Sequence, residues 1–244
     1  MVNRVLTLEQ AARHIHLAVR ELFHLAQQGD IPCRKHNGEY FFEHNAIDDW
    51  AQRNLFELTE KARVRRHCAE LAENRNIEGD TLVVSCLKPE WIQAQLPSRT
   101  KPGAIRDMVA LAFSTGLLYD DAAFLQEVSE REEISSTAME NGAAFLHARY
   151  PDPYRASGSF FVLGKAVHPV FFGAPDGKPT DIFFLLCCVD DELHLRLLSR
   201  LCVLCHESDV LERIRETSNT YDIYDLLKDA EANFLAHVRQ HTGD

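Results

Sequence analysis

A run of seven apolar residues restricts the fold of this chain more than any other feature; it is IFFLLCC, at positions 182–188. A strand with one face in water alternates apolar and polar residues, so an unbroken run predicts a central strand covered on both faces. Other apolar runs predict further extended segments; they are 81–87, 143–146, 160–163 and 167–172. Helical spacing predicts helices at 104–117, 121–130, 191–206, 208–216 and 221–240. Residues 81–244 are therefore expected to form an α/β sandwich around one mixed sheet.

Composition gives an expectation about the compartment. No stretch approaches the roughly 20 apolar residues of a membrane-spanning helix, so we expect a cytoplasmic protein without membrane insertion. Seven cysteines are an odd number in a long chain, which favours reduced, buried thiols over a disulfide framework. The pattern Cys202-x-x-Cys205-His206 lies on an apolar helical stripe, so we expect core packing and no metal, haem or other cofactor.

The net charge of −11 bears on nucleic-acid binding, because the summed field of such a protein repels phosphate. The acidic excess lies in residues 80–244. A nucleic-acid role would therefore need a local basic face in the N-terminal part.

Residues 1–54 carry the pattern of a small separate domain. Thr7 and Gln10 form a capping-box start, and Gly29 is placed as the stop of a second helix. Asn37-Gly38 is a favoured two-residue hairpin turn, and Asn45 can cap a third helix. Residues 55–80 follow as a charged helical connector, which either is solvated or pairs with a second subunit in a homodimer.

The string LTLEQAARHI…VRELFHLAQQGDIPCRKHNGEYFF…IDDW resembles excisionase-type members of the winged helix-turn-helix family related to MerR regulators. The resemblance implies that the second helix enters the DNA major groove and that the hairpin contacts the backbone. The DNA-binding residues that it implies are Arg20, His24, Arg34 and Lys35. A retained fold used for protein contact is the alternative reading.

The stretch REEISSTAMENGAAFLHAR at 131–149 resembles the signature of fructose- and mannitol-type, and of nitrogen-regulatory, enzyme IIA domains of the sugar phosphotransferase system. The flanking segments 82–120 and 182–201 resemble that family as well. The residues that match its motif are Arg131, Glu132, Ser136, Thr137 and His147. The resemblance implies that His147 accepts a phosphoryl group, that Arg131 neutralises its charge, and that Ser136 and Thr137 position it.

A second histidine matches the family's pattern. His194 opens a helix whose apolar stripe continues at spacings of three and four, so its side chain is expected to face inward. The resemblance makes it a partner of the phosphate on His147. Arg149 either assists the phosphate or faces solvent. Relatives have glycines where Ala138 and Glu140 stand and isoleucine-proline where Phe145-Leu146 stand, which alters the loop before His147.

These observations favour a regulator in which a histidine-containing phosphocarrier protein phosphorylates His147 and thereby controls a DNA-binding module. One alternative is a phosphocarrier, a phosphotransferase component that passes its phosphate to a transporter component. The other is a protein-interaction module that is not phosphorylated. Whether the chain is an enzyme stays open between these readings.

Overall fold

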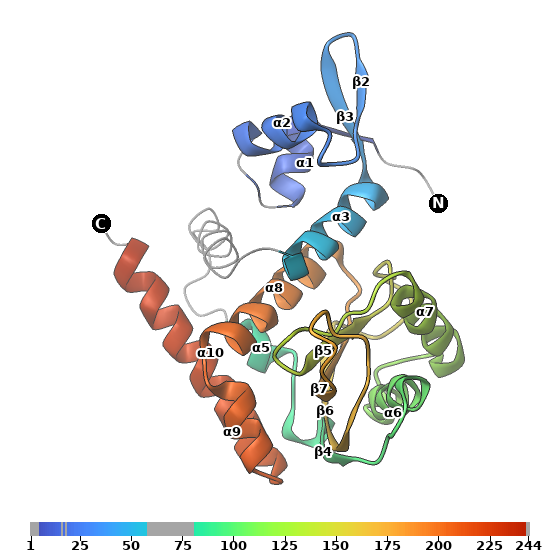
Figure 1. Cartoon of the computed structure of the whole chain (residues 1–244), viewed down its shortest axis with the longest axis vertical. Coiled ribbons are helices and arrows are strands. Elements are labelled where there is room, and N and C mark those ends of the chain that lie inside the picture. The colour runs from blue at the N-terminus through green and yellow to red at the C-terminus, as the bar shows by residue number, and fades with distance from the viewer. Residues whose placement is uncertain (1–4, 16, 18, 58–80, 243–244) are drawn as a thin grey trace. The chain divides into compact units, whose positions relative to one another are not determined.

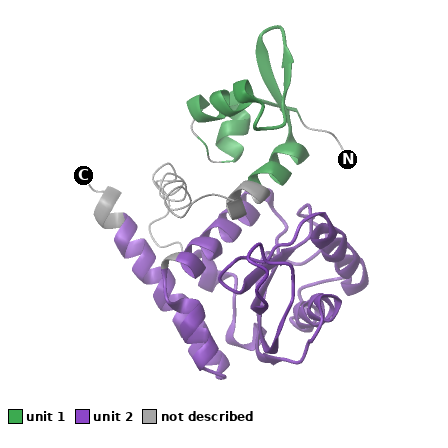
Figure 2. Cartoon of the chain, viewed as in Figure 1, with its two compact units in different colours: residues 1–78 green, residues 79–244 purple. Residues whose placement is uncertain are grey.

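The computed structural model describes residues 5–15, 17, 19–57 and 81–242 (Figure 1). The chain divides into two compact units, residues 1–78 and 79–244 (Figure 2). Among the described helices, none is both long enough and apolar enough to cross a bilayer.

The N-terminal unit combines helices with a small antiparallel sheet of order β1-β3-β2. Its elements are β1 (Val5–Thr7), α1 (Leu8–His14), α2 (Val19–Gln28), β2 (Arg34–His36), β3 (Glu39–Glu43) and α3 (His44–Glu57). The helices pack a core under the sheet, with Leu22, Phe42 and Ile47 fully buried. The apolar side chains of the N-terminal unit therefore form one small hydrophobic core, as the helical spacing predicted.

The local signals of this unit lie where the sequence predicted them. The Gln10 amide donates to the Thr7 hydroxyl oxygen, and the Thr7 amide donates to the Gln10 side-chain oxygen. These two hydrogen bonds complete the capping box. Gly29 follows α2 with a φ of 81°, and Asn37 and Gly38 turn the hairpin with φ of 51° and 89°. The third helix starts at His44, one residue before the predicted cap. The connector prediction lies outside the described residues from residue 58 onward.

The C-terminal unit is built on a mixed four-stranded sheet of order β4-β6-β7-β5. Strand β4 is parallel to β6, β6 is antiparallel to β7, and β5 is parallel to β7. Its elements are α5 (Leu82–Ser85), η1 (Pro89–Trp91), β4 (Ile92–Leu96), α6 (Lys101–Ser114), α7 (Asp121–Ile134), β5 (Ala143–His147), β6 (Phe160–Val170), β7 (Thr180–Cys187), α8 (Asp191–Glu207), α9 (Val210–Glu216) and α10 (Thr220–Thr242).

Helices cover both faces of this sheet. Figure 1 shows α6 and α7 on one side and α8, α9 and α10 on the other. Strand β7 is an internal strand, and its residues from Ile182 to Cys187 are all buried. The α/β prediction drawn from the apolar run is therefore confirmed.

Three predicted extended segments need correction. Residues 81–87 were expected to be extended, but Leu82–Ser85 form the short helix α5. The amides of Val83 and Val84 donate to the Glu231 carboxylate on α10, which supplies the acceptor that the first turn of a helix needs. The apolar runs 160–163 and 167–172 were expected to be separate, but residues 160–170 form the single strand β6, with a register shift between Lys165 and Val170.

A buried ion pair fixes the start of this unit to its last helix. Arg200 on α8 donates to Glu231 at 2.8 Å, and both side chains are fully buried. The same carboxylate holds the first turn of α5. One acidic side chain thus connects α5, α8 and α10.

Candidate functional site

His147 is the last residue of β5, at the end of the strand. Its ring is buried, with only 1% of the residue exposed. Its Nδ1 lies 2.7 Å from the Phe145 carbonyl oxygen. Since a carbonyl oxygen only accepts, Nδ1 carries the proton and donates it, and the ring's lone pair is left on Nε2. The candidate nucleophilic atom is therefore His147 Nε2.

His194 lies beside this ring. It sits in the first turn of α8, where the Asp190 side chain caps the helix by accepting from the Leu193 amide at 2.8 Å. The centroids of the His147 and His194 rings are 5.0 Å apart, with the ring planes tilted by 56°. The predicted inward direction of His194 is seen here, because only 3% of the residue is exposed.

Arg131 completes the group of charged residues around His147. It lies in the last turn of α7, is buried, and donates from Nη1 to the Ser135 carbonyl at 2.9 Å. Burial lowers the pKa of His147 well below its ordinary value of 6.5, and the positive charges of Arg131 and His194 lower it further. The hydrogen bond to the Phe145 carbonyl opposes this shift without reversing it. His147 is therefore a neutral imidazole near pH 7.

Ser136 and Thr137 hold the loop between α7 and β5. Ser136 Oγ donates to the Phe172 carbonyl at 3.1 Å, and Thr137 Oγ1 donates to Glu132 at 2.6 Å. The Glu132 carboxylate also accepts from the Thr137 amide and pairs with Lys101 Nζ at 2.9 Å. Both hydroxyl protons are thus used within the loop, so a role in phosphate binding would require these bonds to exchange.

The loop before β5 has one glycine in the left-handed region, Gly142. The Gly142 amide donates to the Met139 carbonyl, and Gly142 has a φ of 83°. Ala138 pairs with Ala144 as a bridge, and neither Ala138 nor Glu140 has a positive φ. The left-handed position that demands glycine is therefore residue 142, and the two substitutions relative to the family fall where an L-residue fits.

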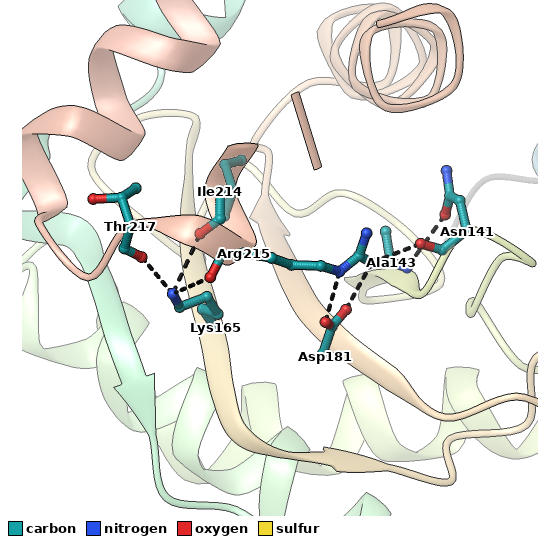
Figure 3. Close-up of polar contacts among 7 residues, drawn as sticks. All are labelled: Asn141, Ala143, Lys165, Asp181, Ile214, Arg215 and Thr217. Atoms are coloured by element: carbon teal, nitrogen blue, oxygen red, sulfur yellow. Dashed lines mark hydrogen bonds and ion pairs between the residues drawn. The ribbon is translucent and has the colours of Figure 1, made fainter. Parts of the chain in front are cut away.

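A guanidinium on α9 braces this turn. Arg215 binds both carboxylate oxygens of Asp181, at 2.7 and 2.8 Å, and donates to the Asn141 carbonyl at 2.8 Å (Figure 3). Beside it, Lys165 on β6 donates to backbone carbonyls at the end of α9, among them that of Ile214 at 3.3 Å. These contacts fix α9 against the start of β5 and β7.

Asn141 relates the two histidine-bearing elements. Its side-chain carbonyl accepts from the Ala143 amide at the start of β5, and its Nδ2 donates to the Cys205 carbonyl on α8. Strand β5 carries His147 and α8 carries His194. Asn141 therefore helps to set the position of one element against the other.

The other predicted site residues are Arg149 and four residues of the N-terminal unit. Arg149 is exposed and lies over the Tyr150 ring. In the N-terminal unit, Arg20 and His24 are exposed one turn apart on α2. Arg34 on β2 pairs with Glu43 at 2.6 Å, and Lys35 lies over the Tyr40 ring at 5.1 Å. These four residues share the unit that the sequence assigned to them.

The sequence did not single out the residues that brace the site. Arg215, Asp181 and Lys101 are far from His147 in the sequence, and no local motif marks them. Asn141 lies within the 131–149 motif, and asparagine is common in turns. Its residue type was the only sequence feature that could have indicated a structural role.

The C-terminal unit is a mixed α/β domain with one buried histidine at the end of β5, a second in the first turn of α8 and a buried arginine in the last turn of α7. Residues 85–230 match the family described as "Phosphoenolpyruvate-dependent sugar phosphotransferase system, EIIA 2". The chain belongs to this family.

Individual relatives agree with that assignment. A nitrogen regulatory protein of Bradyrhizobium diazoefficiens is 28% identical over 148 residues, which cover 59% of this chain and 94% of the relative. A fructose-specific EIIA component of Haloferax volcanii is 28% identical over 151 residues, covering 61% and 96%. The solved nitrogen regulatory protein IIA-Ntr of Neisseria meningitidis has a similar fold, with a TM-score of 0.55, 22% identity and coverage of 60% and 99%.

Proposed function

We propose that His147 is a phosphoryl acceptor of the phosphotransferase system and that a histidine-containing phosphocarrier protein is its donor. The observation that carries this proposal is the neutral His147 ring, 5.0 Å from the His194 ring and close to the charge of Arg131, in a chain of the EIIA family. The carrier's N–P bond breaks as a bond from phosphorus to His147 Nε2 forms. The carrier's ring, protonated on its other nitrogen, leaves as a neutral imidazole, and His147 keeps its proton on Nδ1.

The charges around His147 would stabilise the phosphorylated ring more than the unphosphorylated ring. A phosphorylated histidine adds close to two negative charges, and Arg131, whose positive charge acts on the His147 ring, would interact with them. His194, at the N-terminus of α8, would donate a hydrogen bond to the phosphate with the support of the helix dipole. Ser136 and Thr137 would position the phosphate only after releasing Phe172 and Glu132, and Arg149 is the exposed candidate for contacting the donor.

We propose further that the N-terminal unit is a winged helix-turn-helix module that binds DNA and that phosphorylation changes this binding. Support comes from the order of two helices, a hairpin and a third helix, and from the exposed Arg20 and His24 on α2. Arg34 and Lys35 on the hairpin would contact phosphates, with Arg34 exchanging Glu43 for DNA. The added charge on His147 would change the DNA binding by electrostatics.

The test measures DNA affinity of the full chain, before and after treatment with phosphoenolpyruvate, enzyme I and the phosphocarrier. Wild-type affinity is expected to change on treatment, while His147→Ala is expected to give one affinity in both states. Arg20→Ala should weaken binding and reduce its salt dependence. DNA binding that is absent, or that treatment leaves unaltered while the protein takes up phosphate, overturns the regulatory proposal but not the phosphoryl-acceptor proposal.

A non-phosphorylated interaction module is the second candidate. The observation in its favour is the burial of both rings, since a phosphoryl donor must reach His147 Nε2 and only 1% of that residue is exposed. Failure of the full chain to take up phosphate, in a reaction that labels a control EIIA domain, would place this candidate first. Rapid loss of the phosphate to a transporter component would instead favour the carrier reading.

A further inference from the structure

Two histidines and an aspartate come together in the N-terminal unit. His14 is the last residue of α1, His44 is the first residue of α3, and Asp48 lies one turn further along α3. His14 Nε2 is 2.5 Å from Asp48 Oδ1, and His44 Nδ1 is 3.0 Å from Asp48 Oδ2. The two imidazole rings lie 4.4 Å apart. The cluster therefore joins the first and third helices of this unit through one carboxylate.

The cluster has both the charge and the access that a cation site needs. Both carboxylate oxygens of Asp48 face an imidazole nitrogen, and the carboxylate supplies the negative charge of the set. Asp48 is therefore an anionic ligand. Its side chain is 7% exposed and the two histidine side chains are 16% exposed, so solvent and ions reach the edge of a mostly enclosed group.

We propose that His14, His44 and Asp48 bind one divalent transition-metal ion of the zinc type, with its fourth position open to water. One potential ligand atom from each residue lies within 4.8 Å of the others. Zinc takes imidazole nitrogen and carboxylate oxygen at about 2.0–2.2 Å, which places neighbouring donors of a tetrahedral site about 3.3 Å apart. The pair His44–Asp48, at 3.0 Å, nearly has that spacing, and the pair His14–Asp48 needs to open by less than an ångström.

The chemistry of the donors selects the ion. Calcium takes six to eight oxygen ligands, and magnesium prefers an octahedron of oxygens, whereas this set offers two nitrogens and one carboxylate. The metal would take the imidazole nitrogens that now face Asp48, and each neutral ring would carry its proton on its other nitrogen. A bound ion would then fix α1 against α3.

This site could not be expected from the sequence, which led us to expect no metal. His44 and Asp48 have the spacing of one helical turn, and that was the available signal. His14 lies far away in the sequence and reaches them only through the fold of the unit. The inference uses none of the residues around His147, so it stands or fails independently of the phosphoryl-acceptor proposal.

The experiment titrates the full chain, first stripped with a chelator, with cobalt(II) and then with zinc. We expect one equivalent of cobalt to give the intense visible bands of a tetrahedral site without thiolate charge transfer, and zinc to displace it. His44→Gln and His14→Gln are expected to weaken affinity by at least about a hundredfold, on the scale set by loss of even outer-shell partners. His36→Gln, an exposed histidine on β2, is the matched control and should bind like wild type.

Folding and ligand identity are controlled separately. Circular dichroism of each variant without metal checks that the unit is folded. Saturating zinc should raise the melting temperature of wild type and of His36→Gln only. The proposal is overturned if cobalt does not bind, if its spectrum shows thiolate ligation, or if folded His14→Gln and His44→Gln bind like wild type.

Discussion

Replacing Gly142 by alanine should destabilise the C-terminal unit through its contact with Arg215. Residue 142 has a φ of 83°, and a Cβ built there lies 2.6 Å from Arg215 Nη2 and 3.1 Å from Asp181 Oδ1. The left-handed backbone costs an L-residue about 1–2 kcal/mol. Displacing the partly exposed Arg215–Asp181 pair adds about 1–2 kcal/mol, so the total is about 2–4 kcal/mol.

A second glycine separates the backbone cost from the cost of displacing the ion pair. Gly177 also has a positive φ, of 69°, but a Cβ there meets nothing within 4 Å. Gly177→Ala should therefore cost only the backbone contribution of about 1–2 kcal/mol. Combining Gly142→Ala with Arg215→Met removes the crowded guanidinium, so the cost of the glycine change should fall to the Gly177 value.

Urea unfolding measures these differences. Trp91 packs edge-on against Phe160 in the C-terminal unit, so its fluorescence in a Trp50→Phe background reports on that unit alone. Equal destabilisation by the two glycine substitutions, or an undiminished Gly142 effect in the Arg215→Met background, would falsify the reasoning about the brace.

Two other predictions concern stability. Glu231→Ala should destabilise the C-terminal unit by about 3–5 kcal/mol in the same urea assay, because it leaves Arg200 buried without its carboxylate and the α5 amides without their acceptor. The double change Arg200→Met, Glu231→Leu should cost less, because only the loss of the α5 acceptor remains. Single and double changes of equal cost would contradict this. The pKa of His147 in the folded protein lies well below 6.5. As pH falls, the His147 ring is therefore protonated in the unfolded chain before it is protonated in the folded protein. The free energy of unfolding should decrease below about pH 6.5. His147→Gln should flatten that drop and His206→Gln, at an exposed position on α8, should keep it; identical pH profiles for all three proteins would refute the assignment.

Local signals predicted much of the fold correctly. The apolar run of β7, the Thr7 capping box and the Asn37-Gly38 turn each act within a few residues, and the structure shows all three. Short-range rules of this kind need no knowledge of the partner segments.

Elements that depend on distant partners were not predictable. Leu82–Ser85 has the β-branched pattern of a strand, and it is helical because Glu231, nearly at the other end of the chain, accepts from its amides. Propensity gives way where a tertiary partner satisfies the backbone differently.

Some residues of the candidate site could be predicted from the sequence, and others could not. The resemblance to the EIIA family named His147, His194 and Arg131, and the structure places the two rings together with the charge of Arg131 acting on His147. The brace made by Arg215 and the coupling through Asn141 involve side chains from separate helices and strands. Only the folded chain brings those contacts together.

The most direct test is intact-mass analysis after incubation with phosphoenolpyruvate, enzyme I and the phosphocarrier, for wild type, His147→Ala and His194→Ala. We predict one acid-labile phosphate on wild type, none on His147→Ala, and slower uptake by His194→Ala, with phosphorus–nitrogen NMR placing the bond on Nε2. Phosphate uptake that persists in His147→Ala, or no uptake by wild type beside a labelled control EIIA domain, would contradict the claim that His147 is the acceptor.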